Sequence, residues 1–394
     1  MFLKTVMERN QPLVRLGIEW QQNGVILPDT YLLDYDTILE NARSIKQAGD
    51  ANGVQNFFML KQIGRNPLIA RALTDMGYVG AVCVDFREAL TMVENQIPLG
   101  NVGHLVQIPR AALKKILRAK PVIVTVYTLE KAREISAVCT ELGLHQKLML
   151  RVLGEGDMLY SGQYGGFELQ ELDSAVRAIE AMPNVEVGGV CSFPCFLYDE
   201  AAQDILPMPN LRTVQTAAEM LRARGYRDLM LNTPSATCTH SIPMIAAAGG
   251  THGEPGHGLT GTTPYHAGHP DAEERPGYLY VSEVSHNLGD KAYCYGGGHY
   301  RRGHMKNALV GTTPENAKVV PVLPPDDSSI DYHFELQQNC PVSAAAVMAF
   351  RTQFFVTRSR VAVVKGLSSG KPELAGLYSC LLYTSPSPRD RQKS

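Results

Sequence analysis

Short apolar runs alternate along this chain with segments whose apolar residues recur every three or four positions. Such runs are typical of buried parallel strands, and the longer spacing is typical of helices that pack one face against a sheet. The apolar runs lie at residues 56–60, 79–84, 102–106, 122–126, 147–152, 185–191, 228–231 and 250–253. The helical spacings lie between most of them, at 66–76, 86–95, 110–118, 128–142, 168–182 and 211–224. Eight strands with intervening helices over about 200 residues predict a (β/α)8 barrel. An open doubly wound sheet is the alternative, but no GxGxxG motif follows the first strand.

The part of the chain before the barrel pattern predicts helix. Residues 1–27 indicate an amphipathic helix followed by a turn at Gly24. A short strand from Tyr31 to Tyr35 then leads into a helix that Asp36 caps. We therefore expect an N-terminal helical segment over residues 1–27, ahead of a barrel over residues 28–270.

From residue 271 few helical spacings remain. Strand-like runs with turn residues between them lie at 277–282, 308–310, 319–322, 354–357 and 361–364. This pattern predicts a smaller, mostly β domain over residues 271–379. The stretch from His266 to Pro276, rich in Gly, Pro, Asp and Glu, is the expected crossover between the two domains.

Residues 380–394 differ from the rest of the chain. They have no periodicity after Tyr383, which predicts disorder. They also resemble translated sequencing-adapter read-through, as found at the ends of assembled environmental gene fragments. We therefore interpret them as a non-native tail and exclude them from the fold prediction.

Composition narrows the classes of function. Of 394 residues, 44% are hydrophobic and 19% are charged, which is enough for a large core. The net charge of −2 does not suggest nucleic-acid binding. No apolar run approaches a membrane span of about 20 residues, and the first residues lack the apolar core of a secretory signal. The eight cysteines contain no CxxC pair, so we expect reduced thiols in the cytoplasm. Four histidines crowd residues 252–269, but without ligand-like spacing, so no metal site is expected.

Lys61 directly follows the first barrel strand. Strand ends at the carboxyl edge of an α/β sheet are where catalytic groups lie, and a half-desolvated lysine there has a lowered pKa and an amine able to attack a carbonyl. The alternative is a lysine that extends from the strand end to water.

Two loops offer groups for a phosphate. A glycine-rich loop, residues 251–261, follows the eighth strand, and the loop from Asn232 to Thr237, with its hydroxyls, follows the seventh. Phosphate sites in barrels commonly use these two loops, although a pair of ordinary tight turns is the alternative. Together with Lys61 on the opposite wall, the loops predict a pyridoxal phosphate site, with the phosphate near Ser235, Gly256 and His257.

Six motifs carry a resemblance to a known family. They are MLKQIGRNP, GHLVQIP, LNTPSAT, GEPGHGLTG, CYGGGHYRRGH and DDSSIDY. With them the chain resembles the alanine-racemase-like, fold-type III pyridoxal phosphate enzymes, most closely the YhfX-like group, from about Tyr31 to Tyr378. The resemblance implies a homodimer, Lys61 as the lysine that holds the cofactor, and phosphate contacts at Ser235, Gly256 and His257.

Glu254 matches the position of the partner of the cofactor's ring nitrogen. Alanine racemase has an arginine there, whereas the decarboxylases of this fold have a glutamate in an EPGR sequence, and this chain reads EPGH. A carboxylate keeps the ring nitrogen protonated and makes the cofactor a strong electron sink.

Tyr295 matches the racemase tyrosine that reaches into the neighbouring subunit's site. Racemisation needs one proton-transferring group on each face of the substrate α-carbon, and Lys61 with Tyr295 would be that pair. The alternative is a core residue beside a glycine turn. The decarboxylases use a cysteine within the stretch that corresponds to residues 325–331, and none occurs here. Asp326 and Asp331 in this stretch are expected to bind substrate or orient a neighbour, with a solvated turn as the alternative.

Two positions depart from the racemase pattern. Ser192 stands where racemases carry a histidine that packs on the cofactor ring, and Phe193 or His104 is the expected substitute. Arg151 replaces a racemase lysine, and it is expected to face the cofactor's phenolic oxygen or the substrate carboxylate, with a surface salt bridge as the alternative. The resemblance therefore predicts an amino-acid racemase or epimerase; a decarboxylase of the same fold and a non-catalytic pyridoxal phosphate carrier are the alternatives.

Overall fold

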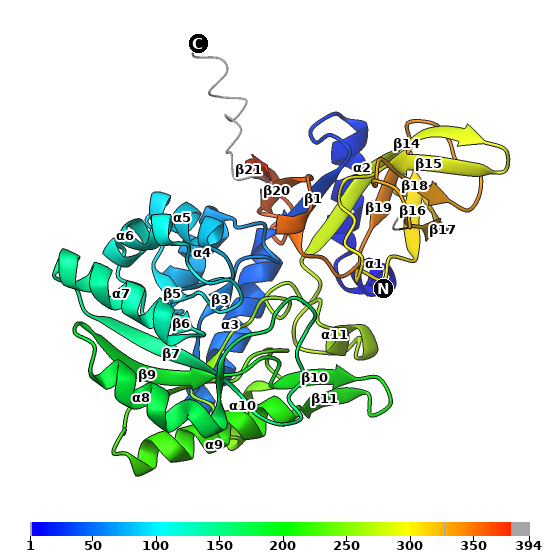
Figure 1. Ribbon diagram of the computed structural model, residues 1–394. Helices are drawn as coiled ribbons and strands as arrows, with labels where there is room; N and C mark the ends of the chain where they lie inside the picture. The colour runs from blue at the N-terminus through cyan, green and yellow to red at the C-terminus, as the bar shows by residue number, and fades with distance from the viewer. Residues whose placement is uncertain (1, 327, 380–394) are drawn as a thin grey trace. The chain divides into compact units, whose positions relative to one another are not determined.

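The computed structural model describes residues 2–326 and 328–379 (Figure 1), so the predicted tail lies outside the described residues. The chain forms two compact units. One, here called the barrel unit, contains Arg43–Leu60 and Pro67–Gly258. The other, the β unit, contains the residues up to Ala42, Lys61–Asn66 and the residues from Leu259 onward.

The barrel unit is built on a ring of parallel strands, as the alternation of strands and helices predicts. Its strands are β2 (Gln55–Asn56), β3 (Phe58–Met59), β4 (Ala81–Cys83), β5 (Leu99–Val102), β6 (Ile123–Val126), β7 (Gln146–Leu153), β9 (Val185–Cys191), β12 (Met230–Asn232) and β13 (His252–Gly253). Their order is β2-β13-β12-β9-β7-β6-β5-β4-β3. Because β2 and β3 come from one apolar run, this order closes on itself, and the (β/α)8 prediction is confirmed.

The closure point explains why the first run is divided into two short strands. Along one extended segment, the Phe57 N–H bonds to the Gly253 carbonyl (3.0 Å), and the Phe58 N–H bonds to the Gly80 carbonyl (3.1 Å). Successive residues of a strand present their backbone groups to opposite sides. The segment therefore joins the last strand on one side and β4 on the other.

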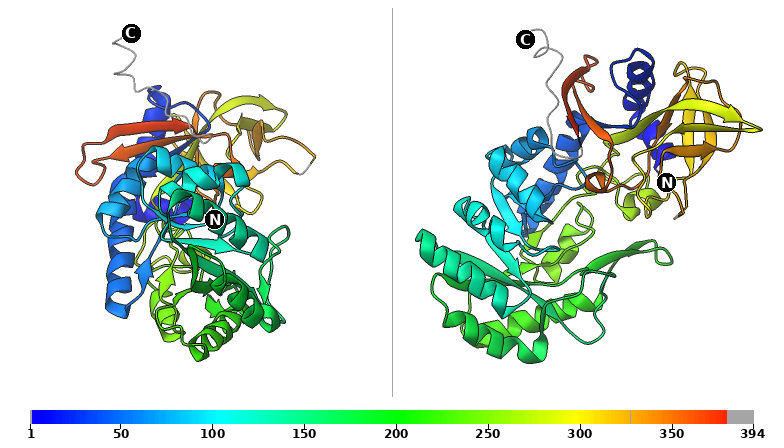
Figure 2. Two further views of the ribbon diagram at one scale, coloured as in Figure 1. Left: turned by 60° about the vertical axis from the view of Figure 1, so that its left-hand side comes forward. Right: turned by 45° about the horizontal axis from the view of Figure 1, so that its top comes forward.

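Helices follow most strands and lie outside the ring (Figure 2). They are α4 (Pro67–Asp75), α5 (Phe86–Glu94), α6 (Arg110–Arg118), α7 (Leu129–Leu142), α8 (Leu172–Glu180), α9 (Pro209–Ala223) and α10 (Ile242–Ala247), with α3 (Tyr35–Asn52) ahead of β2. Side-chain caps start two of them: Asp85 accepts from the Glu88 N–H and Thr128 from the Lys131 N–H. The sequence pattern missed α10, the short β8 (Phe167–Glu168) and the hairpin of β10 (Phe196–Asp199) and β11 (Asp204–Pro207). The 3₁₀ turn η1 (Leu169–Glu171) lies at the start of the helical segment predicted at 168–182.

The β unit is a nine-stranded, mostly antiparallel sheet in the order β15-β18-β17-β16-β19-β14-β1-β20-β21. The strands are β1 (Thr30–Asp34), β14 (Tyr278–Leu288), β15 (Lys291–Tyr295), β16 (Asn307–Gly311), β17 (Lys318–Leu323), β18 (His333–Leu336), β19 (Ala345–Met348), β20 (Arg360–Lys365) and β21 (Glu373–Ser379). The strand predicted near residue 31 therefore lies between β14 and β20, with all five of its residues buried.

The N-terminal segment forms two helices instead of the single predicted one, α1 (Leu3–Arg9) and α2 (Gln11–Gln22). Asn10 separates them because its side chain caps α2 by accepting from the Leu13 N–H, and Pro12 follows in the first turn. Apolar residues of α2 such as Leu13 and Leu16 share one buried cluster with strand residues of the sheet.

Two further predictions for the β unit can be compared with the structure. The strand predicted at 354–357 is wrong: residues Phe354–Val356 form a 3₁₀ turn, η2, closed by a bond from the Thr357 N–H to the Phe354 carbonyl (3.0 Å), and the Phe354 ring stacks on Tyr31 (4.1 Å). The expected crossover contains a short helix, α11 (Pro264–Gly268), whose His266 bonds to buried Glu274 (3.0 Å). Across the described residues, no helix has the length and apolar character needed to span a membrane.

Candidate active site at the carboxyl end of the barrel

Glu254 directly follows β13, and its carboxylate is buried among amide groups. Oε1 accepts hydrogen bonds from Asn232 Nδ2 (2.6 Å) and Asn101 Nδ2 (3.3 Å). Asn232 ends β12 and Asn101 lies within β5, so the two donors come from well-separated strands of the ring. Neutral donors hold the carboxylate in place without neutralising it. Glu254 is therefore a fixed anion at the carboxyl ends of the strands.

His104 faces the second oxygen of this carboxylate. Its Nε2 lies 3.7 Å from Glu254 Oε2, and its side chain is 1% exposed. The ring meets Phe193 edge to face at 5.6 Å. The hydroxyl of Ser192, the neighbouring residue, accepts a hydrogen bond from Asn210 (3.0 Å). The structure thus brings together His104 and Phe193, the two residues that the sequence offered for stacking on the cofactor ring.

Arg151, on β7, is a fully buried cation. It donates to the Tyr127 hydroxyl (2.9 Å) and to the Gln163 carbonyl (2.8 Å), and its guanidinium lies over the Tyr127 ring. No ion pair between described residues includes Arg151, and its Nε has no hydrogen-bond partner among them. The surface salt bridge considered from the sequence does not fit this burial. A buried charge needs a counter-charge or strong hydrogen bonds, so an anionic ligand would suit it.

The loops after β12 and β13 lie against each other. The Glu254 N–H donates to Thr237 Oγ1 (3.2 Å), and a Cβ at Gly258 would collide with the Thr237 carbonyl. Ser235, half-buried, donates to the Phe196 carbonyl (2.7 Å). The buried Thr233 hydroxyl has no hydrogen-bond partner among the described residues. Gly256 is buried and His257 is half-buried in the second loop.

Lys61 continues from the strand that closes the ring. It comes two residues after Met59, whose N–H donates to the carbonyl of Pro255 (2.9 Å), the residue after Glu254. Lys61 itself is half-buried and starts a turn, and its carbonyl accepts from the Phe354 N–H (3.0 Å). Gly64 has φ of 63° in this turn, and a Cβ there would lie 2.8 Å from Val361. The lysine's backbone is therefore held by the β unit.

Tyr295 ends β15 in the β unit and is 39% exposed, so it is not the core residue that the sequence left as an alternative. Its ring lies 5.8 Å from the His333 ring. Its carbonyl accepts from the Ser282 hydroxyl (2.6 Å), which fixes the backbone at the strand end.

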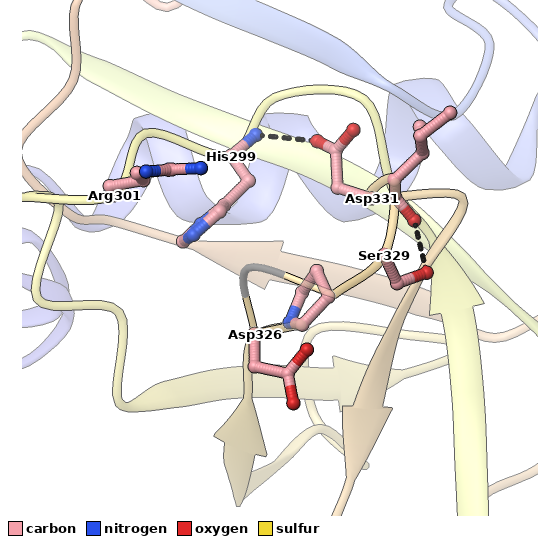
Figure 3. A pocket seen from close by; sticks show the side chains of 7 residues that line it. His299, Arg301, Asp326, Ser329 and Asp331 are labelled. Atoms are coloured by element: carbon pink, nitrogen blue, oxygen red, sulfur yellow. Dashed lines mark hydrogen bonds between the residues drawn. The ribbon is translucent and has the colours of Figure 1, made fainter.

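Asp326 and Asp331 line one small cavity of about 190 Å³ in the β unit (Figure 3). Asp326 is exposed, and hydrogen bonds from Ser328 lower the pKa of its carboxyl. Asp331 instead bonds to the backbone N–H of Gly297 and His299 and to Arg358. The two aspartates therefore have different surroundings.

Sequence reasoning missed the amides of Asn101 and Asn232 and the ring of Tyr127. Asn232 directly follows the strand predicted at 228–231, and a polar residue in that position is a signal that was available. Asn101 was hidden because the strand near it was predicted at 102–106, whereas β5 spans Leu99–Val102.

Two family models match the chain. The model "Alanine racemase, N-terminal domain" matches residues 33–264, and the model "YhfX-like, C-terminal domain" matches residues 279–374. The chain is also 43% identical over 383 residues to the "Uncharacterized protein YhfX" of Escherichia coli (strain K12), a match that covers 97% of this chain and 98% of that protein.

Solved structures share the fold at low sequence identity. A D-threonine aldolase from Filomicrobium marinum has a TM-score of 0.66 at 16% identity, covering 90% of this chain and 94% of that one. An alanine racemase of Clostridium difficile 630 in complex with cycloserine has a TM-score of 0.65 at 14% identity, covering 90% and 99%. A D-threo-3-hydroxyaspartate dehydratase from Delftia sp. HT23 has a TM-score of 0.61 at 14% identity, covering 87% and 95%. These likenesses show the fold.

Proposed function

This chain belongs to the alanine racemase family, with a YhfX-like C-terminal domain, and we propose that it is a pyridoxal-phosphate-dependent amino-acid racemase or epimerase. The observation that carries the cofactor assignment is the buried carboxylate of Glu254, held through Oε1 by two amides at the carboxyl ends of the strands. An anion fixed in this way suits a protonated ring nitrogen.

The other groups of the site fit the cofactor's remaining functions. The amine of Lys61 would hold its aldehyde carbon, while Ser235, Gly256 and His257 would bind its phosphate. Arg151 would bind an anionic oxygen, either the cofactor's phenolic oxygen or the substrate carboxylate, because it is buried without a carboxylate partner among the described residues. His104 and Phe193 would flank the ring. When bound, pyridoxal phosphate withdraws electrons from the substrate α-carbon and makes its hydrogen acidic.

The racemase assignment depends on a second proton-transferring group. Lys61 would take or return the α-proton on one face of the substrate, and Tyr295 of the partner subunit would do so on the other. A side chain that acts in the active site of another subunit must be exposed at the surface of its own subunit. Tyr295 is 39% exposed. We therefore propose a homodimer. The seven cysteines among the described residues form no disulfide, which favours the cytoplasm.

A decarboxylase is the second candidate. The carboxylate of Glu254 favours it, because the decarboxylases that the sequence resembles carry a glutamate at this position. Residues 325–331 contain no cysteine to act as its acid, which opposes it. The same fold also occurs in an aldolase and a dehydratase, so the racemase assignment rests on Tyr295 and Lys61 and not on the fold. A protein that only stores the cofactor would bind it at Lys61 without proton exchange.

Absorption spectroscopy tests the cofactor assignment first. The purified protein supplied with pyridoxal phosphate is compared with Lys61→Ala, and with Lys114→Ala as a control at an exposed helical lysine. We expect a visible band that Lys61→Ala alone loses, and borohydride reduction should attach the cofactor to Lys61. A protein that takes up no cofactor would contradict the assignment.

Proton exchange then tests the reaction. Amino acids are screened in deuterated water for exchange of the α-hydrogen, and Tyr295→Phe is expected to lose the exchange of one enantiomer while it keeps the cofactor band. Release of CO2 would identify a decarboxylase instead. A bound cofactor without exchange from any amino acid would support the storage protein.

A further inference from the structure

The backbone that carries Tyr295 makes hydrogen bonds at most of its polar groups. We call residues 295–299 the Tyr295 turn. Within it, the Gly296 N–H bonds to the Tyr332 carbonyl (2.8 Å), and the Gly298 carbonyl accepts from the Tyr31 hydroxyl (2.6 Å). The Gly297 carbonyl accepts from the Arg358 N–H (3.2 Å). The turn is therefore fixed by several separate segments of the β unit.

Asp331 makes the central contacts to this turn. Its Oδ2 accepts from two backbone N–H groups, those of Gly297 (3.1 Å) and His299 (3.0 Å), and Figure 3 shows the bond to His299. Its Oδ1 accepts from Arg358 Nη1 (2.8 Å), and Arg358 also donates to the Asp331 carbonyl (2.9 Å). Charge-assisted hydrogen bonds of this kind are stronger than neutral ones. Both carboxylate oxygens are thus occupied by the protein itself.

The glycines of the turn allow this close packing. A Cβ at Gly296 would collide with the Asp331 carbonyl, and a Cβ at Gly298 would collide with the ring of Tyr280. Gly297 has φ of 125°, which a residue with a side chain rarely adopts. The sequence Gly296-Gly297-Gly298 thus lets Asp331 reach the backbone directly after Tyr295.

We propose that Asp331 is the positioning residue of Tyr295, an inference that rests on the proposed function. Asp331 does not bind substrate; it holds the backbone N–H groups two and four residues after Tyr295 and so fixes the direction in which the phenol leaves the strand end. A displacement of about 1 Å in a catalytic group costs up to about a hundredfold in rate. The rate of proton transfer by the Tyr295 phenol should therefore depend on Asp331, although Asp331 binds only the backbone and not the substrate.

The experiment compares Asp331→Ala, Asp331→Asn and Tyr295→Phe, with Asp290→Ala as a control at an exposed turn aspartate. For each holoenzyme, α-proton exchange is measured separately from the two enantiomers of a substrate, together with the cofactor band. Amide hydrogen exchange of residues 296–299 reports the turn without any assumption about activity.

Asp331→Ala is expected to lose about a hundredfold in exchange from the enantiomer that Tyr295→Phe also loses, and little from the other. Its cofactor band should be unchanged, and the amides of Gly297 and His299 should exchange faster. Asp331→Asn keeps an acceptor for both N–H groups but loses the charge opposite Arg358, so part of the activity should be rescued. This variant also keeps the test valid if the alanine variant does not fold.

Three results would overturn the inference. If Asp331→Ala exchanges both enantiomers as the wild type does while Tyr295→Phe loses one, Asp331 does not position Tyr295. An equal loss for both enantiomers with cofactor retained would assign Asp331 to substrate binding. If Tyr295→Phe leaves α-proton exchange from both enantiomers unchanged, the proposed racemase function is wrong. The positioning role of Asp331 is then wrong as well, whatever the amide exchange shows.

Discussion

Asn232 Nδ2 lies 2.6 Å from Glu254 Oε1, and this amide-to-carboxylate hydrogen bond joins the ends of two neighbouring barrel strands. Asn232 ends β12, and Glu254 follows β13 directly. Both side chains are buried, so the bond is made away from water. It holds the carboxylate by one oxygen and leaves the other toward His104.

Asn232→Leu tests this bond. The substitution removes the donor from a buried carboxylate, so we expect the unfolding free energy of the cofactor-free protein to fall by about 1–3 kcal/mol. The carboxylate would also lose the shorter of the two bonds that hold it in place, so the affinity for pyridoxal phosphate should fall in a spectroscopic titration. Asn101→Leu is the matched variant, with a smaller effect on cofactor affinity because its bond to Glu254 is longer (3.3 Å), but it also removes the acceptor of the buried Thr125 hydroxyl (2.7 Å). Equal affinity in all three proteins would contradict this role of Asn232.

Asp29 predicts a pH dependence of stability in the β unit. Burial raises the pKa of its carboxyl from 3.8 to about 6, although hydrogen bonds from Ser359 and Tyr280 act in the opposite direction. A raised carboxyl pKa favours the protonated form in the folded state. Stability should therefore fall as pH rises from about 4 to 6 and stay lower above that range.

Asp29→Asn should remove this loss. Asparagine keeps an acceptor for Tyr280 and cannot ionise, so we expect the variant to gain up to about 3 kcal/mol over the wild type above pH 6, and little below pH 4. Denaturant unfolding at several pH values measures the difference. Asp29→Ala serves as the contrast, because it leaves the buried Tyr280 hydroxyl without this acceptor and should be less stable at every pH.

His252 predicts the opposite dependence in the barrel unit. Burial lowers the pKa of its imidazole to about 4, and its ring stacks on Phe57 at 5.1 Å. The unfolded chain takes up a proton below about pH 6.5 and the folded chain does not, so stability should fall as pH drops from 6.5 to 4. His252→Leu should flatten the unfolding free energy over this range. An unchanged slope in the variant would show that other groups cause the acid sensitivity.

Much of the barrel can be predicted because its strands are buried on both faces and stand out as apolar runs. Phe57, Val124 and Val190 lie in such runs. Position after a strand also made Lys61 a candidate, whereas Glu254 was predicted from the resemblance to a known family. The prediction failed where a buried apolar run is not a strand. Phe354 is buried as a strand residue would be, but it lies in a 3₁₀ turn.

The partners of Glu254 were beyond reach for a different reason. Asn101 is 153 residues away along the chain, and nothing local indicates that its amide meets this carboxylate. The sequence predicted that Asp331 binds substrate or orients a neighbour. It could not distinguish these two roles, because the distinction depends on where the Tyr295 turn lies. Such pairings across a closed ring or a sheet are set by tertiary structure alone.

Arg151→Met separates stability from ligand binding. The arginine is fully buried, forms no ion pair with a described residue and has an Nε without a hydrogen-bond partner among them. A buried charge without a counter-charge carries a desolvation cost that an apolar side chain of similar length lacks, so the unfolding free energy of the cofactor-free variant should be unchanged or higher. If Arg151 binds an anionic oxygen of the cofactor or substrate, the variant should lose about 1.5–3 kcal/mol of that affinity, about ten- to hundredfold in Kd. Arg110→Met, at a helix surface, is the control. A less stable variant with unchanged affinities would show that Arg151 stabilises the folded protein, through its bonds to Tyr127 and Gln163, and does not bind the ligand.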